Sequence, residues 1–404
     1  MNQIGQEEPI GFSRLIMTTV LIVGVLILWI TFFPPNKPTE QPGKQQPSAA
    51  AIAPGDKLPE MKPAVPQPVP AEPLSSDKIE TVRLENSEIE LHFSNRGAVL
   101  VHAFMKKFKE KGASLQDDLV SPLAEAMQSY PLAIATGDPA YDKAVNEGLF
   151  HVEQSSQGIF FKWADGKGNS ASKRFSIDEK GYIVSYEISA SKDGKPMETI
   201  PVIWGPGLSR LSKEQAKSNY YLQEYIGYEI GGDFNKYEKK DRQKRKKDDT
   251  KKSGDLVGQE TNLGSGAPWV GMANSYFSAI FFPDEAATLI RVKTIAVGKE
   301  LEKIHPPDTN ILLIIETKGK GRLFLGPKDY ASLKSLGGQV FRMMNWGWSW
   351  FSAICAFLLW GLNKLYAYTA NYGIAILMLT LVMKIFFYPF TQSSMVKMKE
   401  MGEA

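Results

Sequence analysis

The hydrophobic pattern of the chain begins with an uncharged apolar run from 15 to 33. At a rise of about 1.5 Å per residue, a helix of this length just crosses a hydrocarbon core of about 30 Å. A cleaved signal peptide has a shorter apolar core, of about 7 to 15 residues, and a cleavage site of small residues. Here the run ends in Trp29, Phe32 and Phe33 and is followed by two prolines. We therefore predict a retained transmembrane anchor, preceded by a short N-terminal segment, 1–14.

A segment without apolar periodicity follows, from 34 to 76. It consists mainly of Pro, Ala, Gln and Lys and holds about a dozen of the 25 prolines of the chain. Such a composition buries too little apolar surface to offset the entropy lost on ordering. We predict an extended linker, stiffened by polyproline-like stretches.

Between 77 and 334 the pattern changes to short runs in which apolar and polar residues alternate. The apolar positions are Ile89, Leu91 and Phe93 in one run, and Tyr182, Val184, Tyr186 and Ile188 in another. A period of two is typical of strands with one buried face, and Gly-rich turns separate the runs. No long helical stripe interrupts them, so the pattern predicts an all-β sandwich of antiparallel strands.

Two apolar stretches, 335–369 and 370–390, follow the predicted sandwich. The first is rich in aromatic residues, including Trp346, Trp348, Trp350 and Trp360. Aromatic side chains of this kind favour the headgroup level of a membrane. We predict an amphipathic helix lying in the outer membrane interface, and a second full span is the alternative because the stretch is long enough.

The stretch 370–390 predicts a transmembrane helix with one charge, Lys384, well inside the hydrocarbon layer. A lysine at such depth costs roughly 2.5 to 3.5 kcal/mol, less when its side chain reaches the headgroups. However, Thr380, Tyr388 and Gln392 lie at helical i, i+4 spacing from it and form a polar stripe. Such a stripe faces protein or a water-filled cavity, so we expect these four residues to line a substrate groove.

The orientation of the chain is read from its C-terminal end. Pro389 removes a backbone donor and is expected to kink the helix near its exit. Beyond it, 391–404 carries Lys397 and Lys399, which places this end in the cytoplasm. With one span on either side of the predicted sandwich, 1–14 is also cytoplasmic and 77–334 lies outside.

Composition and motifs exclude several classes of function. The net charge of +3 is too small to require nucleic acid, and the basic run 236–252 contains interspersed acids without apolar anchors, which favours a solvated loop. No phosphate-binding loop or dinucleotide fingerprint is present, and the one cysteine, Cys355, has no plausible base beside it. We expect no cofactor and no enzymatic bond chemistry.

The four histidines, His92, His102, His151 and His305, are scattered and lack the spacing of zinc ligands. No sequence pattern groups them with a carboxylate, as acid–base chemistry on a sugar would need. We expect no metal.

Several motifs occur in a characteristic order. They are APWVGMANSYFSAIFFP at 267–283, FLGP at 324–327, the WGWSWF aromatic segment, and a last helix that opens with NYG, has a basic residue thirteen positions later and exits through YPFT. In this order, after an anchor and a Pro-rich tether, they resemble Gram-negative insertases of the YidC family. The resemblance covers essentially the whole chain.

The resemblance implies an inner-membrane protein that assists the insertion, folding and assembly of integral membrane proteins, with or without the Sec translocon. It implies a periplasmic β-supersandwich related in shape to sugar mutarotases. Lys384 occupies the position of a basic groove residue that is arginine in many relatives. The family continues past 391–404, the start of a cytoplasmic hairpin, with four more transmembrane helices, so we expect this sequence to be an N-terminal portion.

The resemblance also implies partners: nascent inner-membrane proteins, the Sec translocon, membrane lipids, and the ribosome through the C-terminal part. An alternative is a membrane-anchored periplasmic carbohydrate-binding or mutarotase-like protein, which rests on fold analogy alone. A third reading is a structural scaffold that docks to the Sec translocon.

Overall fold

The computed structural model describes residues 74–109, 116–156, 158–209, 224–238, 258, 260–296, 309–344 and 349–403. The chain divides into two compact units, one β-rich with described residues from 74 to 344, the other helical with described residues from 349 to 403. The predicted anchor at 15–33 and almost all of the predicted linker lie outside the described residues.

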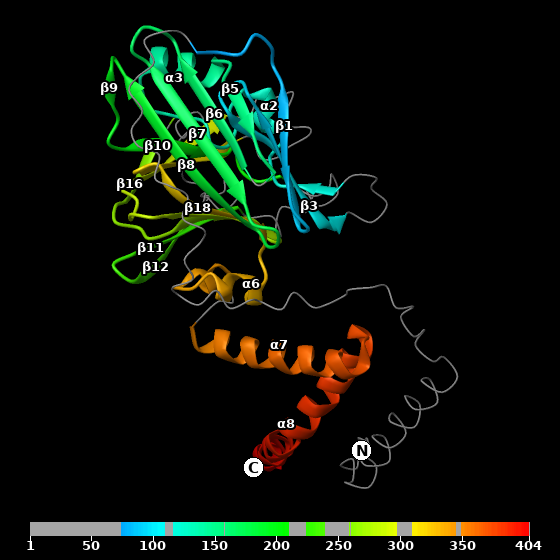
Figure 1. Ribbon diagram of the computed structural model, residues 1–404. Coiled ribbons are helices and arrows are strands. Elements are labelled where there is room, and N and C mark those ends of the chain that lie inside the picture. Colours follow the sequence, from blue (N-terminus) through cyan, green and yellow to red (C-terminus); the bar gives the residue numbers. More distant parts are fainter. Residues whose placement is uncertain are drawn as a thin grey trace. The chain divides into compact units, whose positions relative to one another are not determined.

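The largest sheet of the β-rich unit is ten-stranded and antiparallel, with the order β12-β11-β14-β15-β18-β8-β7-β6-β5 and β9 paired to β8 (Figure 1). Its strands are β5 (His151–Gln154), β6 (Gly158–Ala164), β7 (Ser170–Ile177), β8 (Ile183–Lys192), β9 (Lys195–Pro196), β11 (Tyr225–Ile230), β12 (Asp233–Glu238), β14 (Val270–Ala273), β15 (Phe277–Pro283) and β18 (Lys320–Pro327).

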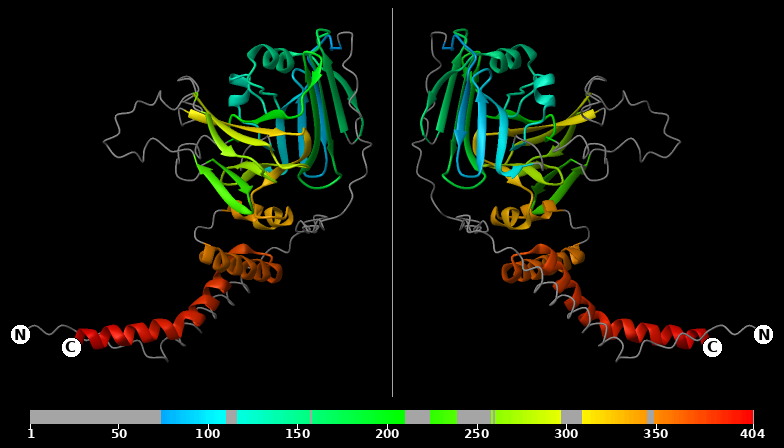
Figure 2. Two further views of the ribbon diagram at one scale, coloured as in Figure 1. Left: turned by 90° about the vertical axis from the view of Figure 1, so that its left-hand side faces the viewer. Right: turned by 90° about the vertical axis from the view of Figure 1, so that its right-hand side faces the viewer.

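Two four-stranded antiparallel sheets complete the described β structure. One has the order β1-β2-β3-β4, from strands β1 (Thr81–Glu85), β2 (Ile89–Ser94), β3 (Val99–Lys109) and β4 (Gln116–Asp118). The other has the order β10-β17-β16-β13, from β10 (Ile200–Trp204), β17 (Thr309–Thr317), β16 (Leu289–Ala296) and β13 (Glu260–Gly264). In both views of Figure 2 the blue strands of the first sheet lie against the green strands of the ten-stranded sheet.

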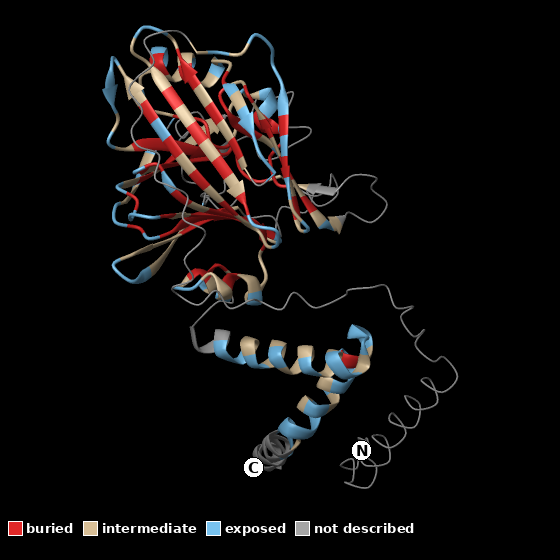
Figure 3. Cartoon of the chain, viewed as in Figure 1, coloured by how far each residue is buried: buried red, intermediate tan, exposed pale blue. Residues whose placement is uncertain are grey.

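One hydrophobic core joins the three sheets, because each contributes an apolar face to it. Buried and partly exposed residues alternate along β2 and β7, as Figure 3 shows for the long strands. The predicted inward positions Ile89, Leu91 and Phe93 are at most 1% exposed. The prediction of a large β-rich domain built from alternating strands is therefore confirmed.

The β-rich domain also contains two short helices that the alternating pattern does not predict, α2 (Leu123–Ala126) and α3 (Pro139–Glu147). The sequence explains why helix α3 begins at Pro139. The carboxylate of Asp138 accepts hydrogen bonds from two backbone N–H groups of the first turn, and Pro139 occupies the first helical position.

A short segment, which we call the collar, packs on the ten-stranded sheet at the end of the β-rich unit. It comprises α6 (Tyr330–Ser335) and the 3-10 helix η3 (Val340–Met344), shown in orange beneath the β11–β12 hairpin in Figure 1. Its buried side chains share a second apolar cluster with Tyr225 and Ile280 of the sheet and with Trp269, which directly precedes β14. The Tyr225 hydroxyl donates a hydrogen bond to the Met343 carbonyl. Hydrophobic burial and a backbone contact thus fix the collar to the sheet.

The helical unit consists of α7 (Ser349–Thr369) and α8 (Tyr372–Glu403). Ala370 has a positive φ of 50° in the turn, and the Asn371 side chain accepts hydrogen bonds from the N–H groups of Gly373 and Ile374, which caps α8. The rings of Tyr366 and Tyr372 stack across the turn at 3.9 Å. These contacts explain why the sequence Asn-Tyr-Gly begins a new helix at this point.

Among the helices that the structure describes, none is both long enough and apolar enough to cross a membrane. The prediction for 370–390 is thus confirmed as a helix but not as a crossing.

Candidate functional site

The four predicted groove residues all lie on α8, and its unbroken helical geometry places them on one side at i, i+4 spacing. Lys384, Thr380 and Gln392 are exposed, and Tyr388 is partly buried. The Thr380 hydroxyl donates a hydrogen bond to the Ile376 carbonyl at 2.7 Å. The structure therefore brings the predicted stripe together but does not test what it contacts.

The polar stripe is surrounded by exposed apolar side chains. These are Ile376, Leu377, Met378, Val382, Ile385, Phe386 and Phe387, each at least 40% exposed. Lys384 is the only charged residue between 372 and 392. A contiguous apolar surface of this kind marks an interaction with lipid or protein, and the single cation sits within it.

The aromatic residues predicted as interfacial anchors are only partly described. Trp360 lies on α7, is 58% exposed and stacks on Phe357 with ring centres 5.9 Å apart. Trp346 and Trp348 lie outside the described residues, and only the backbone of Trp350 is described.

Helix α8 does not end near Pro389, because it continues through this proline to Glu403. The predicted boundary between a helix at 370–390 and a separate segment at 391–404 therefore falls inside one helix. The side chain of Thr391 donates to the Phe387 carbonyl at 3.0 Å, a local bond within the turn that contains the proline.

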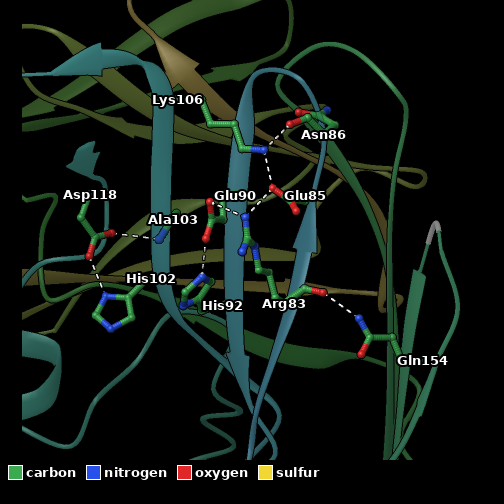
Figure 4. A network of polar contacts seen from close by, with 10 residues as sticks. All are labelled: Arg83, Glu85, Asn86, Glu90, His92, His102, Ala103, Lys106, Asp118 and Gln154. Atoms are coloured by element: carbon green, nitrogen blue, oxygen red, sulfur yellow. Dashed lines mark hydrogen bonds and ion pairs between the residues drawn. The ribbon is translucent and has the colours of Figure 1, made fainter. Parts of the chain in front are cut away.

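A second cluster of polar residues, absent from the sequence-based predictions, lies on the outward face of the β1–β4 sheet (Figure 4). His92 Nε2 is 2.8 Å from Glu90 Oε1, and His102 Nδ1 is 2.8 Å from Asp118 Oδ2. The two imidazole rings are 5.8 Å apart, and the His102 ring stacks on Phe104 at 5.3 Å. The expectation that no histidine is grouped with a carboxylate is wrong for these two.

The pairing of β2 with β3 produces this cluster. His92 lies opposite His102, and a β-bulge between His92 and Phe93 shifts the register so that Phe93 pairs with Leu100. The bulge allows both Leu100 and Ala103 to be fully buried while His102 stays exposed. The alternation along β2 could have placed Glu90 and His92 on the outward face of the sheet. The sequence does not indicate which strand pairs with β2 or in which register.

Hydrogen bonds between oppositely charged or titratable groups connect the residues of this cluster. The hydrogen bond that His102 donates to the Asp118 carboxylate raises the pKa of His102, and burial opposes that shift. On the neighbouring strand the Arg83 guanidinium bonds to both Glu85 and Glu90. Each carboxylate drawn in this network already has a cationic or imidazole partner (Figure 4). The cluster can change its protonation with pH, but it offers no unpaired nucleophile or base.

Metal binding is not supported by the described side chains. Among them, no three His, Cys, Asp or Glu residues gather as ligands. Cys355, on α7, is a free thiol.

The sequence of the chain is similar to sequences of known proteins. The family described as YidC periplasmic domain matches residues 81–360. The membrane protein insertase YidC of Geobacter metallireducens is 26% identical over 417 residues, which cover 96% of this chain and 70% of that protein.

Two solved structures show a weak likeness to this chain. A crystal structure of YidC from Thermotoga maritima has a TM-score of 0.33 and 12% identity and covers 79% of this chain and 72% of its own. A galactose mutarotase-like protein from Lactobacillus casei has a TM-score of 0.40 and 12% identity and covers 61% of this chain and 100% of its own. Likenesses this weak provide no evidence for a sugar site.

The family match covers well over half of the chain, from the first strand of the β-rich unit into α7. It includes both the strands that the alternating pattern predicts and the collar. The chain therefore belongs to the YidC family, whose periplasmic domain it carries.

Proposed function

We propose that this protein is a membrane protein insertase of the bacterial inner membrane, as its relatives are named. It assists the insertion, folding and assembly of integral membrane proteins and performs no bond chemistry. The absence of nucleotide-binding motifs from the sequence supports a driving force that comes from the apolar burial of the substrate or from the membrane potential.

In this proposal the β-rich unit lies in the periplasm, α7 lies along the outer membrane interface and α8 enters the bilayer. The exposed Phe357 and Trp360 of α7 support contact with the interface. The lysines at 397 and 399 support a cytoplasmic end for α8, which also places 1–14 in the cytoplasm.

The observation that carries the proposal is the position of Lys384, an exposed cation on a helix whose other exposed residues nearby are largely apolar. A charge at such a site is tolerated when it faces water or polar protein groups. We infer that the stripe of Thr380, Lys384, Tyr388 and Gln392 forms one wall of a hydrophilic groove. The groove would offer polar substrate segments hydrogen bonds and Coulomb attraction where lipid offers none.

The partners follow from this mechanism. Nascent inner-membrane proteins are the substrates, and those with acidic residues in the translocated tail suit Lys384 best. The Sec translocon and the ribosome are proposed partners on the strength of the family resemblance, and lipids contact the apolar faces of α7 and α8.

Charge reversal tests the proposal. We expect Lys384→Glu to reduce insertion of an acidic-tailed substrate at least tenfold, whereas Lys384→Arg keeps the charge and most of the activity, because the attraction depends on its sign. Lys364→Glu is the matched control, since Lys364 is an exposed lysine on α7. Insertion is measured by protease protection of the translocated tail in membranes whose only insertase is this protein. Equal insertion by wild type and Lys384→Glu would contradict the groove.

A further inference from the structure

Two lysines share one aromatic ring beside the collar. The Nζ of Lys236, on β12, is 4.3 Å from the centre of the Tyr225 ring, and the Nζ of Lys328, just after β18, is 5.2 Å from the same centre. Both cations therefore lie within about one Debye length of each other, where like charges repel at ordinary ionic strength. The ring stabilises each of them, but it adds no negative charge.

The carboxylates closest in sequence neutralise only one lysine of this pair. Glu238 forms an ion pair with Lys236. Asp329 caps α6 by accepting a hydrogen bond from the Ser332 N–H at 2.9 Å. Among the described residues, Lys328 forms no ion pair, and burial together with the charge of Lys236 lowers its pKa to about 8. Among the described residues, Lys328 thus keeps its positive charge without a carboxylate partner, in a partly desolvated place.

The pair is held in position by rigid elements. The Tyr225 hydroxyl is bonded to the Met343 carbonyl of the collar, and the backbone N–H of Lys328 donates to the Tyr276 carbonyl at 2.7 Å. Met343 precedes Trp346 by three residues, so about 11 Å of extended chain at most separates it from the aromatic segment. A site here is therefore tethered to the segment that we propose lies at the headgroup level.

We propose that Lys236 and Lys328 bind the phosphate group of an anionic phospholipid headgroup, with Tyr225 as the fixed ring beside which both ammonium groups lie. The inference rests on the membrane attachment contained in the proposed function. Two ammonium groups near one ring suit a phosphate, because its charge is spread over several oxygens that can accept hydrogen bonds from more than one donor. Lysines near a membrane surface strengthen the attraction to anionic lipid. Such a contact would fix the collar side of the β-rich unit at the membrane surface.

The test titrates the full chain, in a neutral detergent, with short-chain phosphatidylglycerol and with phosphatidylcholine of equal chain length, by calorimetry. We expect phosphatidylglycerol to bind more tightly, and Lys328→Gln and Lys236→Gln each to weaken it about fivefold. Lys334→Gln is the matched control, because its Nζ lies 5.4 Å from the centre of a different ring, Tyr330, in the same collar. It should change the affinity by less than about twofold.

The remaining outcomes separate the possible failures. Equal weakening by all three variants, or by none, would overturn the site. If inorganic phosphate at the same concentration as the lipid competed fully, the ligand of the site would be free phosphate and not the lipid headgroup. Flotation with lipid vesicles in a density gradient tests membrane attachment separately. If the wild-type chain did not float with the vesicles, the proposed function would fail. If it floated but Lys328→Gln kept the preference for phosphatidylglycerol, only this site would fail. Unchanged near-UV circular dichroism shows that each variant is folded.

Discussion

The ammonium nitrogen of Lys173 lies 2.7 Å from the carbonyl oxygen of Gly97, inside the core of the β-rich unit. A second bond of 2.7 Å joins it to the Leu132 carbonyl, and the residue is fully buried. Gly97 and Leu132 both have positive φ angles, 73° and 71°. One side chain on β7 thus satisfies two carbonyls from two separate loops, which would otherwise be buried without a donor.

Replacing this lysine by methionine should destabilise the β-rich unit. Lys173→Met keeps the length of the side chain but leaves two buried carbonyls unsatisfied, at a cost of about 1 to 3 kcal/mol for each lost partner. Urea unfolding followed by tryptophan fluorescence measures the change. Lys162→Met on the neighbouring β6 is the control, because the ion pair of Lys162 with the half-exposed Glu153 is worth less than about 1 kcal/mol. Equal stability of wild type and Lys173→Met would contradict the role of the buried lysine.

The same lysine predicts a pH dependence. Burial lowers the pKa of Lys173 from 10.5 to about 7. Between these values the unfolded chain binds the proton more strongly than the folded one, so the contribution of this group to stability rises with pH and is flat below about 7. The stability difference between wild type and Lys173→Met should therefore grow as the pH rises from 7 to 9. A difference that does not change with pH would refute this.

The histidine cluster predicts a shift that magnetic resonance can observe. The hydrogen bond that His102 donates to the Asp118 carboxylate raises the pKa of His102 above 6.5. The contribution of this bond to folding stability is therefore fully present below pH 6.5 and is lost as the pH rises through the folded pKa. Asp118→Asn removes the negative charge while keeping an oxygen acceptor, so the pKa of His102 should fall. Titration of the His102 ring protons checks this, and an unchanged titration would show that Asp118 does not control the ring.

Two paired glycines predict different effects of the same substitution. A Cβ on Gly271 would lie 2.8 Å from the Ala279 carbonyl oxygen, a backbone atom of the next strand. A Cβ on Gly227, its partner across β11 and β14, would lie 3.1 Å from the flexible Met343 side chain and from the Phe234 ring. Gly271→Ala should therefore cost about 1 to 3 kcal/mol and Gly227→Ala clearly less, as measured by urea unfolding. The reverse order would contradict the packing described here.

Local patterns predicted the parts of the fold that depend on local physics. Alternation placed Ile89, Leu91 and Phe93 in the core because strand periodicity needs no knowledge of partners. The same rule could have placed Lys173 inward, since it alternates with Ala171 and Phe175 on the buried face of β7. Likewise, Asp138 followed by Pro139 is a sequence signal for the start of α3.

The rest depends on contacts between distant segments. The facing of His92 and His102 requires both the pairing of β2 with β3 and the position of a bulge, neither of which a single sequence fixes. The meeting of Lys236 and Lys328 at Tyr225 joins residues about a hundred positions apart in sequence. On α8, by contrast, the stripe around Lys384 follows from helical spacing alone. That spacing does not indicate which groups the stripe contacts.

The central claim, that Lys384 faces water within the membrane, is tested most directly by thiol labelling. Lys384→Cys is made in the protein with Cys355→Ser, which removes the one native thiol. Val382→Cys is the control, because Val382 is exposed in an apolar part of the same helix two residues away. In inside-out vesicles, a membrane-impermeant maleimide should label Lys384→Cys rapidly and Val382→Cys hardly at all. Lack of labelling at both positions, in a protein that remains in the membrane, would contradict a water-filled groove.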